Sequence, residues 1–211
     1  MRDRAFGVFS RSLIAASGAV LAILHASSPA DAALVIFTQT ATWTATAGGN
    51  DHIYEAVLFD SVVSWTDARD AALARGGHLA TITSAAENAF IFDNLASNPA
   101  LWDSSPTPMA DGPYLGGFRA AGAPGGSGDS WQWVTGEAWN HTAWAPGEPN
   151  NNPNDLQGLA YWSLQGPAST WFDHTASDPV SRALIVEYPV PAPAAAAFVL
   201  LCGIMPRRRM R

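Results

Sequence analysis

The pattern of hydrophobic and polar positions predicts a strand and two helices in the first half of the chain. Residues 53–59 alternate between the two classes and predict an edge strand. Ser64 then precedes a helical pattern over residues 65–75, with Asp67 at its third position. Gly76 and Gly77 end this helix, because glycine accepts the left-handed backbone on which helices stop. One face of the predicted helix carries Trp65, Ala68, Ala72 and Leu73.

A second helix and a series of short strands follow. Residues 78–82 predict a short strand, and Ser84 with Glu87 forms a capping box that opens a helix through about Leu95. The pattern leaves residues 38–51 as an irregular lead-in, 96–112 as a loop and 120–129 as a glycine-rich turn. Further strands are predicted over residues 114–118, 131–134, 159–163, 169–172 and 183–188. This order of elements predicts an α+β fold with the helices packed on antiparallel sheets.

The apolar faces of these elements predict the core. Apolar residues make up 48% of the chain, and there are nine tryptophans, which is enough for one domain with a substantial core. The residues expected to be buried are Trp65, Leu73, Leu79, Ile82, Phe90, Trp131, Trp133, Ile185 and Tyr188.

The charge of the folded region restricts its partners. Residues 33–189 contain four arginines, no lysine and 16 acidic residues, a net charge of −12. A surface this acidic disfavours nucleic acid and anionic lipid, although it tolerates divalent cations.

The first 32 residues have the features of a secretory signal. Arg2 and Arg4 precede an apolar run from Ser12 to Ala26, and Ala30-Asp31-Ala32 is a small-x-small cleavage site. Export permits disulfides, yet the one cysteine, Cys202, lies in the C-terminal tail. The exported domain is therefore expected to be held together by packing alone.

The C-terminal residues 189–211 predict a sorting or anchoring tail. An uncharged run from Ala194 to Met205 follows two prolines and precedes clustered arginines, which favour the cytoplasmic side of a membrane. The run has 12 residues, fewer than the roughly 20 that span a bilayer unaided. The tail resembles the PEP-CTERM sorting signals of Gram-negative bacteria, although it departs from them at Ala192 and Pro206; a plain membrane tail is the alternative. Either interpretation predicts an exported protein, anchored in the inner membrane and then placed at the cell surface or in the extracellular matrix.

A loop over residues 140–158 carries the candidate chemistry. Between Glu148 and Asp155 it holds two carboxylates and four side-chain amides, and Pro146, Pro149 and Pro153 exclude a helix or central strand. Carboxylate and amide oxygens are the donors that calcium prefers. A solvated turn is the simpler alternative. A loop this long tends to be either functional or disordered, and the aromatic residues on both sides predict that this one is held in place.

Six motifs in order make residues 52–188 resemble a C-type lectin-like domain. They are W-x-x-A with GGHLATI-x-S-x-x-E over 65–87, Y-L-G-G at 114, W-x-W-x-x-G at 131, W-x-x-G-E-P-N-N at 144, W-x-D at 171 and I-V-E-Y at 185. Each is weak alone, whereas their order and spacing together are specific. The resemblance implies two helices beside small antiparallel sheets and a long loop that binds calcium and sugar.

The resemblance also implies a set of calcium ligands. In sugar-binding members a Glu-Pro-Asn run with a cis proline supplies two of them, which here are Glu148 and Asn150. Asp155 and Asp173 match the later acidic ligands, and Asn154 is a neighbouring candidate. Glu148, Asn150, Asp155 and Asp173 would also contact the sugar, with mannose- or glucose-type hydroxyl geometry.

The chain departs from the family pattern in two respects. Phe172 stands where the family has a ligating asparagine. Phenylalanine has no oxygen to offer calcium, so water or a nearby asparagine would have to take that place. The family's two disulfides are absent: their positions fall at Ala72 and Val186, and near Gln157 and Thr175 or Ala176. Losing a staple in the loop can cost a few kcal/mol, which bound calcium would partly offset.

These observations favour a calcium-dependent lectin that recognises glycans or exopolysaccharide. The alternative is a calcium-independent module that binds cell-surface or matrix proteins on the same fold, which Phe172 favours. No motif of an enzyme is found: there is no H-E-x-x-H, no ordered Ser/His/Asp set and no cysteine nucleophile in the domain. His174, beside Asp173, is a candidate contact to a metal or sugar, but an exposed histidine in a loop is commoner and is what we expect.

Overall fold

A computed structural model of the chain describes residues 33–103, 110–150, 152 and 154–190. The predicted signal peptide, residues 104–109 of the predicted loop, Asn151, Pro153 and the tail from residue 191 lie outside this part of the chain. Among the described residues, no helix is long and apolar enough to cross a membrane.

The elements follow the predicted order and confirm an α+β fold. The helices are α1 (Trp65–Ala74) and α2 (Ala85–Ile91), which continues as a π-helical turn over Phe92–Ala96; short 3-10 turns cover Ala45–Ala47 and Pro99–Leu101. The strands are β1 (Val35–Thr42), β2 (Ile53–Val63), β3 (His78–Leu79), β4 (Ala110–Arg119), β5 (Trp131–Trp133), β6 (Gln157–Ser163), β7 (Trp171–Thr175) and β8 (Ser181–Tyr188).

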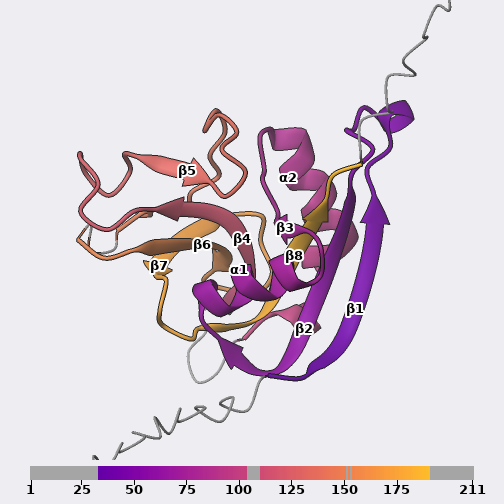
Figure 1. Ribbon diagram of the computed structural model, residues 1–211, viewed down its shortest axis with the longest axis horizontal. Coiled ribbons are helices and arrows are strands. Elements are labelled where there is room, and N and C mark those ends of the chain that lie inside the picture. The colour runs from indigo at the N-terminus through magenta and orange to yellow at the C-terminus, as the bar shows by residue number, and fades with distance from the viewer. Residues whose placement is uncertain (1–32, 104–109, 151, 153, 191–211) are drawn as a thin grey trace, which may run out of the picture. The chain divides into compact units, whose positions relative to one another are not determined.

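The strands join in one sheet instead of several small ones (Figure 1). Its order is β1-β2-β8-β4-β6-β7, with β3 added to β8 and β5 added to β4. All pairings are antiparallel except that of β4 with β8, which meet at Tyr114 and Leu184. The last strand of the chain, β8, therefore lies in the middle of the sheet, between β2 and β4.

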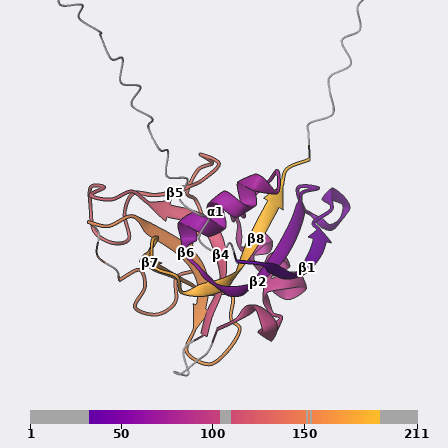
Figure 2. The same ribbon diagram turned by 60° about the horizontal axis from the view of Figure 1, so that its bottom comes forward.

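The two helices lie on opposite faces of the sheet, each over its own apolar cluster. Successive residues of a strand point to opposite faces, and Ala56 and Ile185 pack with Ile91 of α2, whereas Val57 and Val186 pack with α1. Figure 2 shows α1 over β8 and β4. The sheet is therefore covered on both sides, which explains why β8 reads as an almost continuous apolar run.

Helix α1 forms as predicted, with one correction. The Ser64 hydroxyl accepts a hydrogen bond from the Asp67 amide, and the Asp67 carboxylate accepts from the Ser64 amide, so the capping box is complete. Trp65 is buried, and its Nε1 donates to the carbonyl oxygen of Leu115 at 2.8 Å. Gly76 ends the helix with a φ of +85°. The prediction that Leu73 is buried was wrong, because 57% of it is exposed.

Helix α2 begins with half of the predicted capping box. The Ser84 hydroxyl accepts from the Glu87 amide, but the Glu87 carboxylate accepts from the amide and hydroxyl of Thr83 instead of the Ser84 amide. Glu87 also accepts from the hydroxyl of Tyr54 at 2.6 Å. Its carboxylate therefore ties α2 to β2 in the core as well as capping the helix.

The presence of strand β1 contradicts two predictions, one about residues 38–51 and one about the edge of the sheet. Residues 38–51 were expected to be irregular, yet residues 35–42 form a strand that pairs with β2. The predicted strand over 53–59 is present, but it does not lie at the edge, because β1 covers it there. Residues 78–82 also form only a two-residue strand.

The predicted core is largely confirmed. Trp65, Leu79, Ile82, Trp131, Trp133 and Ile185 are buried, whereas Phe90 and Tyr188 are only half-buried.

Apolar packing and hydrogen bonds hold the positions where the resemblance implied cysteines. Ala72 and Val186 are both fully buried in the apolar cluster under α1. Gln157 and Thr175 are direct partners between β6 and β7. The Gln157 amide Nε2 donates to the carbonyl oxygens of Asn152 and Asp155, at 2.8 and 3.1 Å. The Gln157 side chain therefore holds the end of the loop at a position where the resemblance implied a disulfide.

Candidate functional site

The long loop between β5 and β6 is fixed to strand β7, as its aromatic flanks predicted. Trp171 is bracketed by backbone hydrogen bonds: its amide donates to Ala143, and its carbonyl oxygen accepts from Ala145, both at 2.8 Å. Trp144 thereby forms a parallel bridge with Trp171. The segment that follows, from Pro146 to Asp155, starts from a fixed backbone.

A cluster of tryptophans lies beneath this attachment. The ring of Trp139 is 4.4 Å from that of Trp133, and Trp144 contacts Trp131 edge to face at 4.9 Å. Trp171 is fully buried among them. Aromatic contacts of this kind add about 0.5–1.5 kcal/mol each beyond the area they bury, so the cluster fixes the loop more firmly than its proline and asparagine content suggests.

Three predicted site residues, Glu148, Asn150 and Asp173, come together above the cluster. Asn150 donates twice: its amide N binds Oδ1 of Asp173 at 2.8 Å, and its Nδ2 binds Oε1 of Glu148 at 2.8 Å. The Glu148–Pro149 peptide bond is cis, as the resemblance implied. Residues 148 and 150 of the loop therefore meet a side chain of β7 that lies 23 positions later.

The electrostatics of this group are those of two carboxylates held close together. Burial and the neighbouring Asp173 carboxylate raise the pKa of Glu148 to about 7. Oε2 of Glu148 is buried and accepts no hydrogen bond, which is rare for a buried carboxylate oxygen. A bound proton relieves the repulsion below pH 7; a cation would do so at higher pH. Two carboxylates and an amide are donors that suit calcium.

Asp155 and Asn154 are held elsewhere in the loop. Oδ2 of Asp155 accepts from Nδ2 of Asn152 at 3.0 Å, and Nδ2 of Asn154 donates to Oδ1 of Asn152 at 3.1 Å. Within the described part of the chain, no three acidic, histidine or cysteine side chains gather closely enough to hold a metal ion. The expected convergence of Asp155 and Asn154 with Glu148 therefore stays a prediction.

Phe172 and His174 face away from the site. Alternation along β7 puts them on the opposite face from Asp173, and their rings contact each other at a tilt, with centroids 5.4 Å apart. The expectation that His174 lies in an exposed loop was wrong: it is buried against Tyr114, and burial lowers its pKa to about 4. His174 is therefore neutral and does not contact a ligand at the Glu148 site.

Ser127 is a residue of the site that sequence reasoning missed. Its hydroxyl donates to the carbonyl oxygen of Pro149 at 2.8 Å and so ties the glycine-rich turn to the loop. Arg119 supports that turn from below, because its guanidinium donates to carbonyl oxygens of Ala123 and Asp129. No motif or residue spacing in the sequence predicts the contact between Ser127 and Pro149.

The sequence matches no protein-family model and no curated protein. Solved structures do match. The chain is similar to the carbohydrate-recognition domain of the mouse scavenger receptor C-type lectin, with 18% identity over 69% of this chain and 94% of that one and a TM-score of 0.47.

Two further structures match, and one of them is described as calcium-independent. A calcium-independent C-type lectin from Saxidomus purpuratus is 18% identical over 67% of this chain and 88% of its own, with a TM-score of 0.49. The cow C-type carbohydrate-recognition domain of CD23, solved in the presence of an oligosaccharide, is 18% identical over 67% and 90%, with a TM-score of 0.47. Identities below 25% and TM-scores below 0.5 do not say what this chain binds.

Proposed function

We propose that the domain binds carbohydrate through a calcium ion held by Glu148, Asn150 and Asp173. Oε2 of Glu148 carries the proposal: within the described part of the chain no N–H or O–H group donates to this buried oxygen, and the Asp173 carboxylate lies beside it. Above pH 7, where Glu148 is ionised, this arrangement would destabilise a purely structural turn, because a buried charge without compensation is costly. A divalent cation would compensate both charges at once.

The residues of the site have distinct parts in this binding. Calcium, when bound, supplies coordination positions for two neighbouring sugar hydroxyls. Asn150 is exposed and brings a donor to the surface, and Glu148 brings an acceptor beside it. Asp173 is buried in β7 and orients Asn150 through the backbone amide. Asp155 and Asn154 are the proposed additional ligands, which would have to leave their contacts with Asn152.

Retention on a mannose-type resin tests the proposal. We expect the purified chain to be retained in millimolar calcium and released by a chelator. Glu148→Gln should reduce retention by at least tenfold, since it removes one charge-assisted contact to the ion or the sugar. Glu137→Gln is the matched control, because Glu137 is exposed outside the site and its loss should change nothing. Equal retention with and without calcium would contradict the proposal.

A calcium-independent module for cell-surface or matrix proteins is the second candidate. Two observations favour it: Phe172 offers no oxygen at a position where the family has a ligand, and the described residues contain no three-acid cluster. In this case calcium would change neither stability nor glycan retention, and a protein partner would bind equally in a chelator.

We also propose that the protein acts outside the cytoplasm. The sequence features of residues 1–32 and 189–211 support export and anchoring of the domain. Mass spectrometry of the membrane-bound and surface-released forms tests this, with a mature N-terminus at Ala33 expected in both. A soluble cytosolic product with Met1 intact would contradict it.

A further inference from the structure

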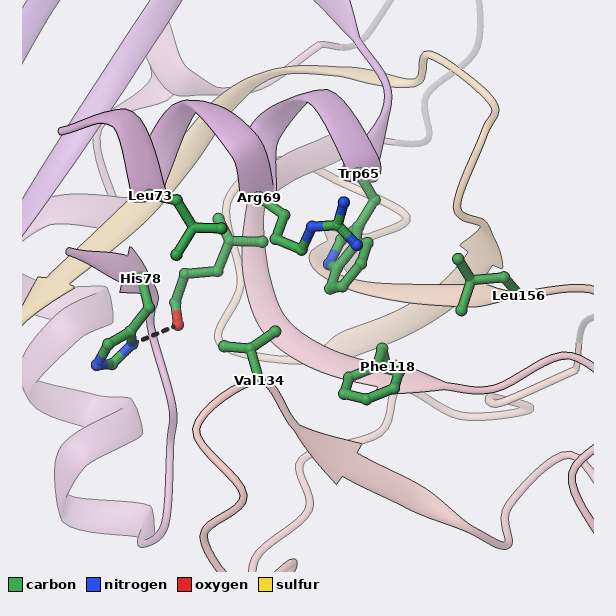
Figure 3. Close-up of a pocket in the computed structure, with 8 residues that line it drawn as sticks. Trp65, Arg69, Leu73, His78, Phe118, Val134 and Leu156 are labelled. Atoms are coloured by element: carbon green, nitrogen blue, oxygen red, sulfur yellow. Dashed lines mark hydrogen bonds between the residues drawn. The ribbon is translucent and has the colours of Figure 1, made fainter. Parts of the chain in front are cut away.

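A cavity of about 280 Å³ opens beneath α1, separate from the residues of the loop site (Figure 3). Its walls come from α1, β3, β4, the residue after β5 and the residue before β6. The lining residues are Trp65, Arg69, Leu73, His78, Leu79, Phe118, Val134 and Leu156. This volume lies near the lower limit of small-molecule sites, which span roughly 300–1,000 Å³.

The helix presents one continuous ridge to this cavity. Trp65, Arg69 and Leu73 are spaced by four residues, so their side chains lie in one row along α1. Trp65 is buried at the inner end of the row, whereas Leu73 is 57% exposed at the outer end. Opposite them, Phe118 and Val134 form an apolar floor. The apolar side chain of Leu73 is therefore exposed to water, and a ligand in the cavity would cover it.

Arg69 is the cation that this cavity offers. Its guanidinium lies 5.8 Å from the centroid of the Trp65 ring and pairs with Oδ1 of Asp70 at 2.7 Å. Both side chains of this pair are substantially exposed, 39% and 65%, and exposed pairs contribute about 0–1 kcal/mol. Arg69 can therefore turn from Asp70 to an anion at the mouth of the cavity at little cost.

His78 is the other lining residue that can carry a charge, and its side chain is already engaged in other contacts. Nδ1 of His78 hydrogen-bonds the carbonyl oxygen of Leu79 at 3.0 Å, and it also lies 3.8 Å from the buried carboxylate of Glu187. The lining contains no acidic residue. An anion at Arg69 would thus meet no negative side chain inside the cavity, in a domain that is otherwise strongly acidic.

We propose that this cavity binds a compact amphipathic monoanion. Its apolar body, an aryl group or a short alkyl chain, would lie against Phe118 and Val134 and cover Leu73. Its carboxylate would face Arg69. A cation of the same shape would gain no partner there, and a neutral molecule would gain the apolar contacts alone.

Three probes with one common body test the inference on the full chain. These are 4-phenylbutyrate, the neutral 4-phenylbutanol and the cationic 4-phenylbutylamine, titrated with saturation-transfer NMR as the readout. We expect 4-phenylbutyrate to bind about two- to fivefold more tightly than the alcohol, because an ion pair with the partly exposed Arg69 contributes at most about 1 kcal/mol. The amine should bind most weakly. No binding of 4-phenylbutyrate at millimolar concentration to the folded protein would overturn the inference.

Variants separate the charge from the apolar body. Arg69→Gln should weaken 4-phenylbutyrate about two- to fivefold and leave the alcohol unchanged. Leu73→Asp should weaken both; Leu164→Asp is its control, because Leu164 is 58% exposed outside the cavity. Equal effects of the two leucine variants would indicate binding outside the cavity and overturn the inference. None of these positions belongs to the Glu148 site, so a failure here is distinct from a failure of the calcium proposal.

Discussion

The backbone amide of Asn150 donates a 2.8 Å hydrogen bond to Oδ1 of Asp173, although 23 residues separate them. This contact brings a carboxylate of the sheet to the edge of the long loop, where Glu148 already lies. It is a hydrogen bond to a charged acceptor, the kind that contributes about 1.5–3 kcal/mol. The loop and strand β7 therefore form one unit.

Calcium binding should release a proton from Glu148. Its pKa of about 7 in the ion-free protein means that the carboxyl is mostly protonated at pH 6. A cation requires the ionised form. We expect about one proton per bound ion at pH 6, far less at pH 8, and an apparent Kd that rises about tenfold per pH unit below 7. Calorimetry in two buffers of different ionisation enthalpy measures this; a Kd independent of pH between 5.5 and 8 would contradict it.

Asp173→Asn should lower the pKa of Glu148 and abolish the response to calcium. The variant removes the neighbouring charge that helps to raise this pKa, while the asparagine oxygen can still accept from the Asn150 amide. The carbon-detected NMR titration of the Glu148 carboxyl measures the shift. Asp93→Asn, at an exposed position on the π-helical turn, is the control and should leave the Glu148 titration unchanged.

Ser64→Ala should destabilise the domain by about 1 kcal/mol, because it removes the hydroxyl that caps α1. For a domain of this size the Tm should fall by roughly 2–4 °C. Ser61→Ala is the comparison, since the Ser61 hydroxyl contacts only the adjacent exposed Asp60 carboxylate. The cap would be energetically irrelevant if both variants melted together with the wild type.

His174→Phe should remove a pH dependence of stability. Burial holds the pKa of His174 at about 4, below its ordinary value of 6.5, so the unfolded chain binds the proton more readily. The contribution of neutral His174 to the free energy of unfolding is then complete above pH 6.5, and it is lost as the pH falls toward 4. The variant keeps a ring against Tyr114 and Phe172. Urea unfolding at several pH values should show wild type losing stability relative to the variant over that window; a constant difference would refute the assignment.

The sequence predicted the elements whose faces differ in polarity and failed where they do not. Helix α1 was found with its cap and its glycine stop, since each has a local signal. Strand β1 was missed because six of its first seven residues are exposed, so no alternation marks it. Leu73 was misplaced for another reason: a helical pattern shows which face is apolar, but it does not show that a cavity opens beside that face.

The candidate site was predicted in part for similar reasons. Glu148 and Asn150 are close in sequence, and the resemblance supplied Asp173, which the structure brings to them. The fold alone revealed Ser127 and the buried position of His174, because both depend on contacts between distant segments. Asp155 shares the loop with Glu148, yet its hydrogen bond to Asn152 shows that closeness in sequence does not ensure a common site.

Calcium-dependent thermal unfolding of the purified chain is the most direct test of the central claim. An ion that binds only the folded state stabilises it by about 2.7 kcal/mol when its free concentration is about 100 times Kd. We therefore predict a rise in Tm of roughly 5–10 °C at pH 8. Magnesium should give a smaller rise, and Glu148→Gln should lose most of the effect. An unchanged Tm at millimolar calcium and pH 8 would contradict the calcium site and leave the calcium-independent interaction module as the function of this domain.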